Sequence, residues 1–182
     1  MRRSRWLVLV SMLTVALAAT AGVAYGLGHR TTGTTSLTGG SIEQVRMVRS
    51  SVPFKTNGGT WRSIPGASTT VTVAAGHHAD VLARFSGGFS CSADDGSPNG
   101  TCSVRILIGK AEGEPATGTS LAIGSVQGGA TAGSLTASVE RSRGPLGPGS
   151  YKVVVQQRTG SLLIGVEFDS WHLTVKRIEA AA

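Results

Sequence analysis

The sequence predicts an all-β fold, an antiparallel β-sandwich of jelly-roll or Greek-key type with about nine strands, preceded by a signal-peptide helix. Two observations carry this prediction. Short runs in which apolar and polar residues alternate recur along the chain, and residues typical of turns separate them. Beyond the first 25 residues, no window repeats its apolar residues with the 3.6-residue period of a helix. The order of the strands within the sheets does not follow from these patterns.

The N-terminus has the layout of a secretory signal peptide over residues 1–21. A basic region holds three arginines, residues 6–19 form an apolar core, and Ala19-Thr20-Ala21 offers a small-residue cleavage site. The alternative is an uncleaved signal anchor, because the apolar stretch can be extended to Leu27 and then reaches the ~20 residues that span a bilayer. We therefore expect a protein that is secreted or held at the cell surface, with membrane contact only if this segment stays attached.

Two further regions follow the signal segment. Residues 22–41 are rich in Thr, Gly and Ser without an apolar period, which predicts a flexible linker. Alternation begins at residue 42, so residues 42–182 are predicted to form the β-sandwich domain. The nine segments that alternate best are residues 42–48, 68–74, 79–85, 102–108, 120–126, 134–139, 151–157, 162–168 and 171–175.

The charge of the exported chain is mildly basic. Removal of Arg2, Arg3 and Arg5 from the 17 basic residues leaves 14 against 10 acidic ones, a net charge of +4. The basic residues are dispersed and are not interleaved with aromatic residues, which argues against nucleic-acid binding. Such a protein is attracted to anionic cell-wall polymers or lipid surfaces, although ordinary solubility explains the same charge.

Cys91 and Cys102 are the two cysteines of the chain, and they flank a segment rich in turn-forming residues. In an exported protein this arrangement predicts a disulfide, and we expect it to close the neck of a β-hairpin. A zinc site would need two further Cys or His residues at short spacing, and none lies near them. The cross-link is expected to stabilise the fold by ~3 kcal/mol.

Four runs of the sequence resemble small secreted β-sandwich proteins of high-GC Gram-positive bacteria. These runs are G-x-x-A-D-V-L-A-R-F-S-G from Gly76, C-S-V-R-I-L-I-G from Cys102, P-G-S-Y-K-V-V-V-Q-Q from Pro148 and F-D-S-W-H-L-T-V from Phe168. The resemblance covers about residues 60–177. It implies the same fold and export that the residues predict, and it carries no activity and no site residue to this chain.

Two predicted loops are the candidate binding elements. Asp94, Asp95 and Asn99 lie in the loop that the disulfide closes, and a loop pinned in this way loses less entropy on binding. Arg141 and Arg143 begin a Pro- and Gly-rich run that excludes a helix or a central strand. The oxygen atoms of the first loop suit calcium, but Asp and Asn equally favour turns, and we predict no metal site.

Histidine and aromatic residues give weaker indications. His77 and His78 are expected in a polar turn, since neighbouring side chains on a strand would point to opposite faces. Trp171 alternates in phase with Leu173 and is expected in the core, whereas Trp61 begins a strand after a turn and its placement stays open. The aromatic residues considered as a sugar-stacking platform are Trp61, Phe89, Tyr151 and Trp171.

Three functional hypotheses remain. Common catalytic, phosphate-binding and redox motifs are missing from the sequence, so no cofactor is predicted, and a non-catalytic domain that binds a protein or a cell-envelope glycan comes first. An extracellular hydrolase assembled from scattered His, Asp and Ser comes second, and it needs a pocket where a histidine meets a carboxylate or a serine. A tumour-necrosis-factor-like trimer comes third, and it needs an exposed apolar stripe along one sheet edge.

Overall fold

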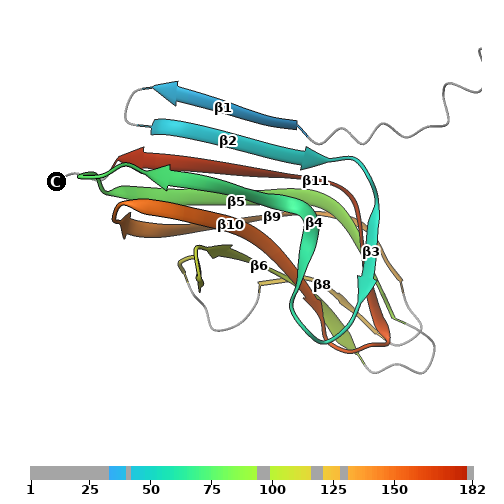
Figure 1. Cartoon of the computed structure of the whole chain (residues 1–182). Helices are drawn as coiled ribbons and strands as arrows, with labels where there is room; N and C mark the ends of the chain where they lie inside the picture. The colour runs from blue at the N-terminus through green and yellow to red at the C-terminus, as the bar shows by residue number, and fades with distance from the viewer. Residues whose placement is uncertain (1–32, 40–41, 94–98, 116–120, 128–130, 180–182) are drawn as a thin grey trace, which may run out of the picture. The chain divides into compact units, whose positions relative to one another are not determined.

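Two antiparallel β-sheets face each other in the computed structural model and form the predicted β-sandwich (Figure 1). The structure describes residues 33–39, 42–93, 99–115, 121–127 and 131–179. The predicted signal segment lies outside these residues. Within the described ranges, the structure contains no helix long and apolar enough to cross a membrane.

The sheets contain six and five strands, and their neighbours alternate in direction throughout. The six-stranded sheet consists of β1 (Gly33–Gly39), β2 (Ile42–Ser50), β3 (Phe54–Asn57), β5 (Ala79–Ala93), β9 (Thr131–Leu146) and β11 (Ile164–Glu179). The five-stranded sheet consists of β4 (Arg62–Val73), β6 (Gly100–Ile108), β7 (Ala111–Glu112), β8 (Leu121–Val126) and β10 (Gly149–Thr159).

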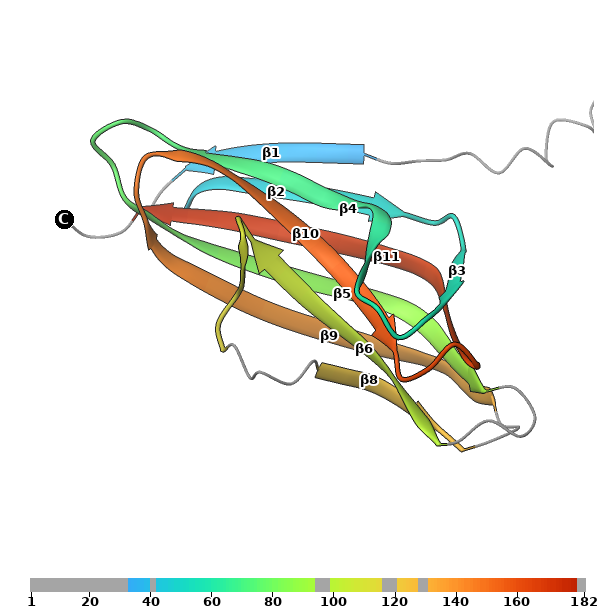
Figure 2. The same cartoon turned by 60° about the horizontal axis from the view of Figure 1, so that its bottom comes forward.

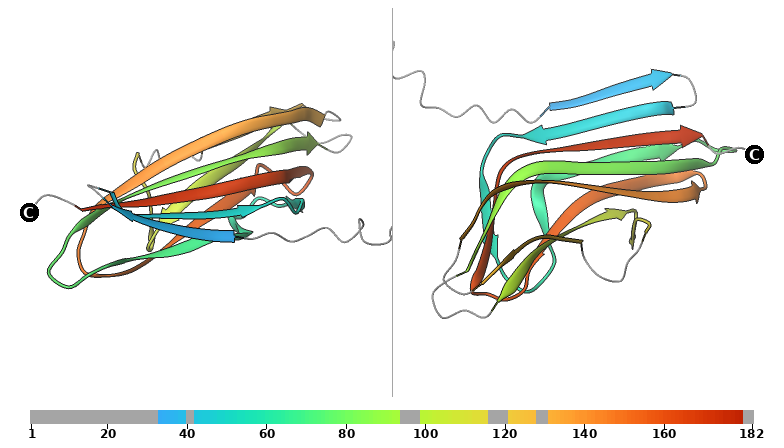
Figure 3. Two further views of the ribbon diagram at one scale, coloured as in Figure 1. Left: turned by 90° about the horizontal axis from the view of Figure 1, so that it is seen from above. Right: turned by 180° about the vertical axis from the view of Figure 1, so that it is seen from behind.

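The chain passes repeatedly from one sheet to the other. Every connection between β3 and β6 leads from one sheet to the other, and so does every connection between β8 and β11. Strands that follow each other in the sequence there belong to different sheets and do not pair (Figure 2). This connectivity is of the jelly-roll or Greek-key kind that the sequence predicts. Figure 3 shows the long strands of the six-stranded sheet side by side in the order β1, β2, β11, β5 and β9.

The core fills the space between the sheets with alternate residues of every long strand. The expected inward set on β5, which includes Val81, Ala83 and Phe85, is buried. Trp171 is buried as predicted, and Phe85 packs between it and Phe168 at centroid distances of 6.2 and 6.0 Å. Period-2 alternation thus predicts which residues of these strands lie inside.

The disulfide between Cys91 and Cys102 is present, with Cα atoms 6.2 Å apart, but it does not close a hairpin. Cys91 lies on β5 of the six-stranded sheet and Cys102 on β6 of the five-stranded sheet, and these two strands are not paired. Both sulfur atoms belong to inward-facing residues, so the bond crosses the interior. The hairpin prediction is wrong because alternation gives the face of a strand and not its sheet.

Two other expectations need correction. Residues 33–39, predicted as part of the flexible linker, form the edge strand β1 and pair with β2. The physical reason is that Thr has a high propensity for strands and that pairing with β1 satisfies the outer backbone groups of β2. Asp169 and Ser170, predicted as a turn, instead form an irregularity within the single strand β11, opposite β5. The extra residue places Phe168 and Trp171 both on the inner face.

Candidate binding surface on the five-stranded sheet

The outer face of the five-stranded sheet carries a compact group of arginines around one tryptophan. Inward residues of β6 and β10 alternate with outward ones, which puts Arg105 of β6 and both Gln156 and Arg158 of β10 on the outer face. Gln157 of β10 pairs with Arg62 of β4, so the preceding residue, Trp61, lies beside Arg158. We call Trp61, Arg105, Gln156 and Arg158 the Trp61 platform.

Both guanidinium groups of the platform lie against the indole ring. The Cζ atom of Arg105 is 4.3 Å from the centroid of the Trp61 ring, and that of Arg158 is 4.8 Å from it. These distances are those of cation–π contacts. Arg105 also donates two hydrogen bonds to Oε1 of Gln156, from Nε at 2.9 Å and from Nη2 at 2.7 Å. The Gln156 side chain therefore holds the Arg105 guanidinium in a set orientation.

The platform brings two positive charges together near one negative charge. Burial lowers the pKa of Arg105, the positive charge of Arg158 lowers it further, and the negative charge of Glu112 opposes both. Arginine nevertheless stays protonated at neutral pH, because its ordinary pKa lies so high. Two cations thus share one small, partly desolvated surface, and the carboxylate of Glu112 acts on Arg105 more strongly than the charge of Arg158 does.

The structure describes three of the five residues predicted as binding elements, Asn99, Arg141 and Arg143. Asp94 and Asp95 lie outside the described residues, and Asn99 is exposed just before β6. Arg141 is 6% exposed and donates to the carbonyl oxygen of Glu140, so it does not present its guanidinium on a loop. It belongs to β9, where alternation turns it inward.

Arg143 is half-buried and belongs to β9 as well. It donates from Nη1 to the carbonyl oxygen of Ile108 and so ties the edge of one sheet to the other. The Pro-rich run after it lies at the end of an edge strand, which agrees with the prediction that no central strand forms there. The backbone contact gives Arg143 a role in holding the two sheets.

Of the four aromatic candidates, Trp61 is the one on an outer face next to charged groups. Phe89 and Trp171 are buried in the core, and Tyr151 is half-buried with its hydroxyl donating to the carbonyl oxygen of Gly147 at 2.9 Å. The signal for Trp61 in the sequence was its position at the start of a strand. The sequence carries no signal for its arginine partners, which are 44 and 97 positions further along the chain.

A serine and a histidine meet on the outer face of the other sheet. Oγ of Ser86 on β5 lies 2.7 Å from Nε2 of His172 on β11, and His172 is exposed as predicted. An open depression of about 320 Å³ next to it is lined by Arg49, Ser50, Ser51, Ser170, Trp171 and His172.

The Ser86–His172 pair meets the distance that a hydrolase needs, but it lacks the other parts of a nucleophilic site. In the part of the chain that the structure describes, no carboxylate hydrogen bonds to His172 and orients its ring. The pair also lies in the middle of a paired strand, whose backbone N–H groups serve the sheet instead of an oxyanion. The contact is a cross-strand hydrogen bond between facing residues, Ser86 and His172 being register partners.

The large apolar side chains exposed in the described ranges do not form a stripe along one edge. Met47 lies on β2 and Leu135 on β9, which are separated by β11 and β5. Leu162 and Leu163 lie between β10 and β11, beside a second open depression of about 300 Å³. The described surface therefore lacks the feature that a tumour-necrosis-factor-like trimer requires.

No family model matches this sequence, and no curated protein matches it. Among solved structures, latent PorU from Porphyromonas gingivalis is similar at 10% identity over 74% of this chain and 12% of PorU, with a TM-score of 0.36. The CBM22-1 xylan-binding domain of Xyn10C from Paenibacillus barcinonensis matches at 12% identity over 85% of each chain, with a TM-score of 0.27.

A carbohydrate-binding module of lichenase 5A from Cellvibrio mixtus, in complex with cellotriose, matches at 16% identity over 85% of this chain and 92% of the module, with a TM-score of 0.22. This chain spans only about an eighth of the length of PorU, as the 12% coverage states. TM-scores this low carry nothing about function, and the β-sandwich rests on the sheet pairing described above.

Proposed function

We propose that the protein is an exported, non-catalytic binding domain that holds an anionic cell-envelope glycan on the Trp61 platform. The observation that carries the proposal is the pair of guanidinium groups at 4.3 and 4.8 Å from one tryptophan ring. Arginine recognises carboxylates and phosphates through planar, paired hydrogen bonds, and these groups are the acidic parts of envelope polymers.

The platform is preorganised for such a ligand. Cross-strand pairing between Gln156 and Arg105 fixes both residues on rigid, central strands of the sheet. The two hydrogen bonds from Arg105 to Gln156 restrict the arginine before any ligand arrives. Side chains that are already ordered lose less entropy on binding, which favours affinity.

A polymer fits the platform better than a folded protein partner. Stable protein–protein interfaces bury about 800 Å² on each partner around a mostly apolar centre. The platform consists instead of guanidinium, amide and indole groups, and Val154 and Leu107 are the neighbouring apolar residues in the next row of the sheet. An extended anionic chain needs only a narrow charged track of this kind.

Export supports the choice of an envelope ligand. The signal segment predicts secretion, and a disulfide buried between the two sheets persists in an oxidising compartment. The dispersed positive charge of the exported chain also attracts anionic surfaces at long range. The platform then supplies the short-range contacts.

The test is affinity electrophoresis in native gels that contain polygalacturonate, with the fully methyl-esterified polymer as a matched uncharged ligand. Arg105→Gln/Arg158→Gln is expected to weaken retardation by about tenfold or more, since hydrogen bonds to charged groups contribute ~1.5–3 kcal/mol. Added salt is expected to weaken the wild-type interaction as well. Trp61→Ala should also weaken retardation by the charged polymer, because the indole ring positions both guanidinium groups.

Arg84→Gln is the matched control, because Arg84 is also an exposed strand arginine and donates to Oγ of Ser138 at 2.9 Å on the other sheet. It removes one positive charge without touching the platform, so its effect on retardation shows how much of the loss comes from net charge alone. Equal retardation by the charged and esterified polymers would overturn the proposal. So would a double variant that binds as well as the wild type while keeping its far-ultraviolet circular dichroism.

A further inference from the structure

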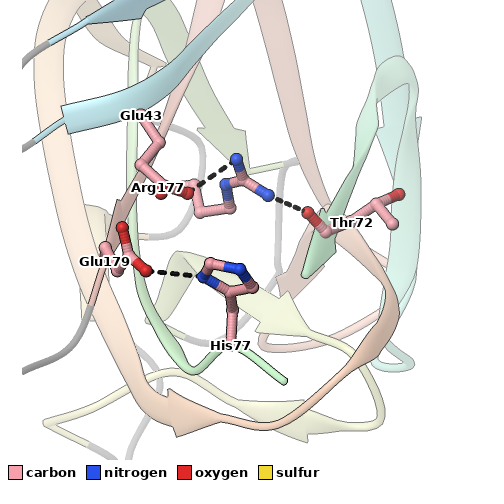
Figure 4. Close-up of polar contacts among 5 residues, drawn as sticks. All are labelled: Glu43, Thr72, His77, Arg177 and Glu179. Atoms are coloured by element: carbon pink, nitrogen blue, oxygen red, sulfur yellow. Dashed lines mark hydrogen bonds and ion pairs between the residues drawn. The ribbon is translucent and has the colours of Figure 1, made fainter. Parts of the chain in front are cut away.

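Three side chains from distant parts of the sequence converge at one end of the six-stranded sheet. Glu43 comes from β2, His77 from the connection between β4 and β5, and Glu179 from the end of β11. One ligand atom from each of the three lies within 4.8 Å of the other two (Figure 4). Glu43 is half-buried, and the other two residues are exposed.

Strand pairing brings these residues together. Glu179 pairs with Ala79 at the start of β5, so His77, two residues earlier, lies beside the end of β11. The register between β2 and β11 shifts between Arg177 and Ile178, and Glu43 is the β2 residue at this irregularity. The backbone N–H of His77 donates to the carbonyl oxygen of Ala74 at 3.2 Å, which holds the turn that presents the imidazole.

Each carboxylate of the group pairs with a basic side chain from another strand or connection. Nδ1 of His77 lies 2.6 Å from Oε1 of Glu179, and Nη2 of Arg177 lies 2.6 Å from Oε2 of Glu43. Arg177 also donates to the carbonyl oxygen of Thr72, so it is held in place from the facing sheet (Figure 4). Arg177 thus pairs with Glu43, and the imidazole of His77 pairs with Glu179.

The two carboxyl groups also compete for a proton. A hydrogen bond with Glu179, followed by burial, raises the pKa of Glu43, although the charge of Arg177 opposes this rise. Hydrogen bonds to Glu43 and His77 lower the pKa of Glu179. The two carboxyl groups therefore lie close enough to affect each other, in agreement with the spacing of the three ligand atoms.

We propose that Glu43, His77 and Glu179 bind a Zn²⁺ ion. One imidazole nitrogen and two carboxylate oxygens are ligands that zinc accepts, and three protein ligands leave the fourth position for water. The imidazole argues against calcium and magnesium, which take oxygen ligands. Ligand atoms in a tetrahedral zinc site lie roughly 3.3 Å apart, so zinc binding requires the 2.6 Å contact between His77 and Glu179 to open slightly and the widest spacing, at most 4.8 Å, to close by side-chain rotation.

Arg177 is the neighbour that opposes a cation, and its position limits this effect. It occupies Oε2 of Glu43, and a carboxylate offers its second oxygen to an ion. The arginine also orients the glutamate, as residues behind metal ligands commonly do. The two carboxylates and the charged Arg177 together carry a net charge of −1 before the imidazole is counted, and a divalent ion reverses this charge.

The bound ion would join β2, the β4–β5 connection and the end of β11. The site is separate from the Trp61 platform, which lies on the outer face of the five-stranded sheet. A negative result for one of the two proposals therefore leaves the other proposal unaffected. Its expected consequence is stability, because an ion that binds only the folded chain raises the unfolding temperature.

The experiment is thermal unfolding and isothermal titration of the tag-free exported protein with ZnCl₂, and with MgCl₂ as the comparison ion. The wild type is expected to show one zinc site and an unfolding temperature that rises with zinc concentration, with no comparable rise for magnesium. His77→Ala and Glu179→Gln should each weaken zinc binding by about tenfold or more. For each variant, the unfolding temperature with zinc is compared with the unfolding temperature of the same variant without zinc. A change in the stability of the zinc-free variant therefore does not affect the comparison.

His78→Ala is the matched control, because His78 is the exposed neighbour outside the trio. It should keep the zinc response of the wild type. Cobalt supplies a second readout, since Co²⁺ in a four-coordinate site develops visible absorbance that His77→Ala should abolish. A wild type without a zinc response, or a response that survives in both His77→Ala and Glu179→Gln, would overturn the proposal.

Discussion

Gln157 is a polar residue in an interior made of apolar side chains. Alternation along β10 turns it inward with Val153 and Val155, and its side chain is 1% exposed. Neither Nε2 nor Oε1 has a hydrogen-bond partner among the described residues. An unpartnered buried amide costs about 1–3 kcal/mol relative to an apolar group of the same shape.

We expect Gln157→Met to leave the free energy of unfolding unchanged or to raise it by up to about 2 kcal/mol. Methionine has a similar length and no amide to desolvate. Urea unfolding followed by tryptophan fluorescence measures the difference. A loss of more than about 1 kcal/mol would show instead that the amide is satisfied in solution, for example by an internal water.

The platform residues show what single-residue patterns can and cannot predict. The outward direction of Arg105 follows from alternation along its strand, and so does the burial of Trp171. The meeting of Arg105 with Trp61 does not, because it depends on β10 lying between β4 and β6. A pattern within one strand contains no information about which strand lies next to it.

At the scale of elements, β11 depends on a local irregularity opposite Gly87. The register with β5 shifts between Phe168 and Ser170, and the backbone of β11 there approaches β5 closely. A Cβ atom on Gly87 would lie 2.5 Å from the carbonyl oxygen of Ser170 and 3.0 Å from Cβ of Trp171. The glycine is therefore required for this close approach of two backbones.

Gly87→Ala is expected to destabilise the fold by ~1–3 kcal/mol, because the atom it meets is backbone and cannot rotate away. The matched control is Gly133→Ala on β9, where a Cβ would have no heavy atom within 4 Å. Urea unfolding of the two variants checks the expectation. Equal stability of both variants would mean that β11 can shift to accept the methyl group.

The ends of the strands could be predicted from the sequence where residues typical of turns lie in real turns. Gly76 does mark one, and its φ of 80° requires glycine between β4 and β5. Asp169-Ser170 looks the same in sequence, yet the backbone stays extended there because β5 pairs with both halves of β11. Pairing partners from distant sequence thus decided between a turn and an irregular strand.

At the scale of the whole molecule, the disulfide is the covalent link between the two sheets. Cys91 and Cys102 are fully buried and lie on central strands of different sheets. The cross-link closes a segment with a sequence separation of 11 and so restricts the unfolded chain. Chain entropy for a loop of this size amounts to ~3 kcal/mol.

We expect Cys91→Ala/Cys102→Ala to lose ~3 kcal/mol of stability, together with a smaller loss from missing sulfur contacts in the core. The wild type in reducing buffer is the control, because it keeps the sulfur atoms and loses only the cross-link. Thermal unfolding of the three samples separates the two terms. Two titratable thiols in the folded exported protein would contradict the bond itself.

β11 also has a consequence for how the protein is made and delivered. It is the last described strand, and it pairs with β2, β3 and β5. Without β11, the strands β2 and β3 would have no pairing to β5 in the six-stranded sheet. A growing chain therefore cannot complete this sheet until the ribosome has passed residue 179. A chain whose sheet closes this late agrees with the export that the N-terminal segment predicts, because an unfolded chain can pass through a secretion channel.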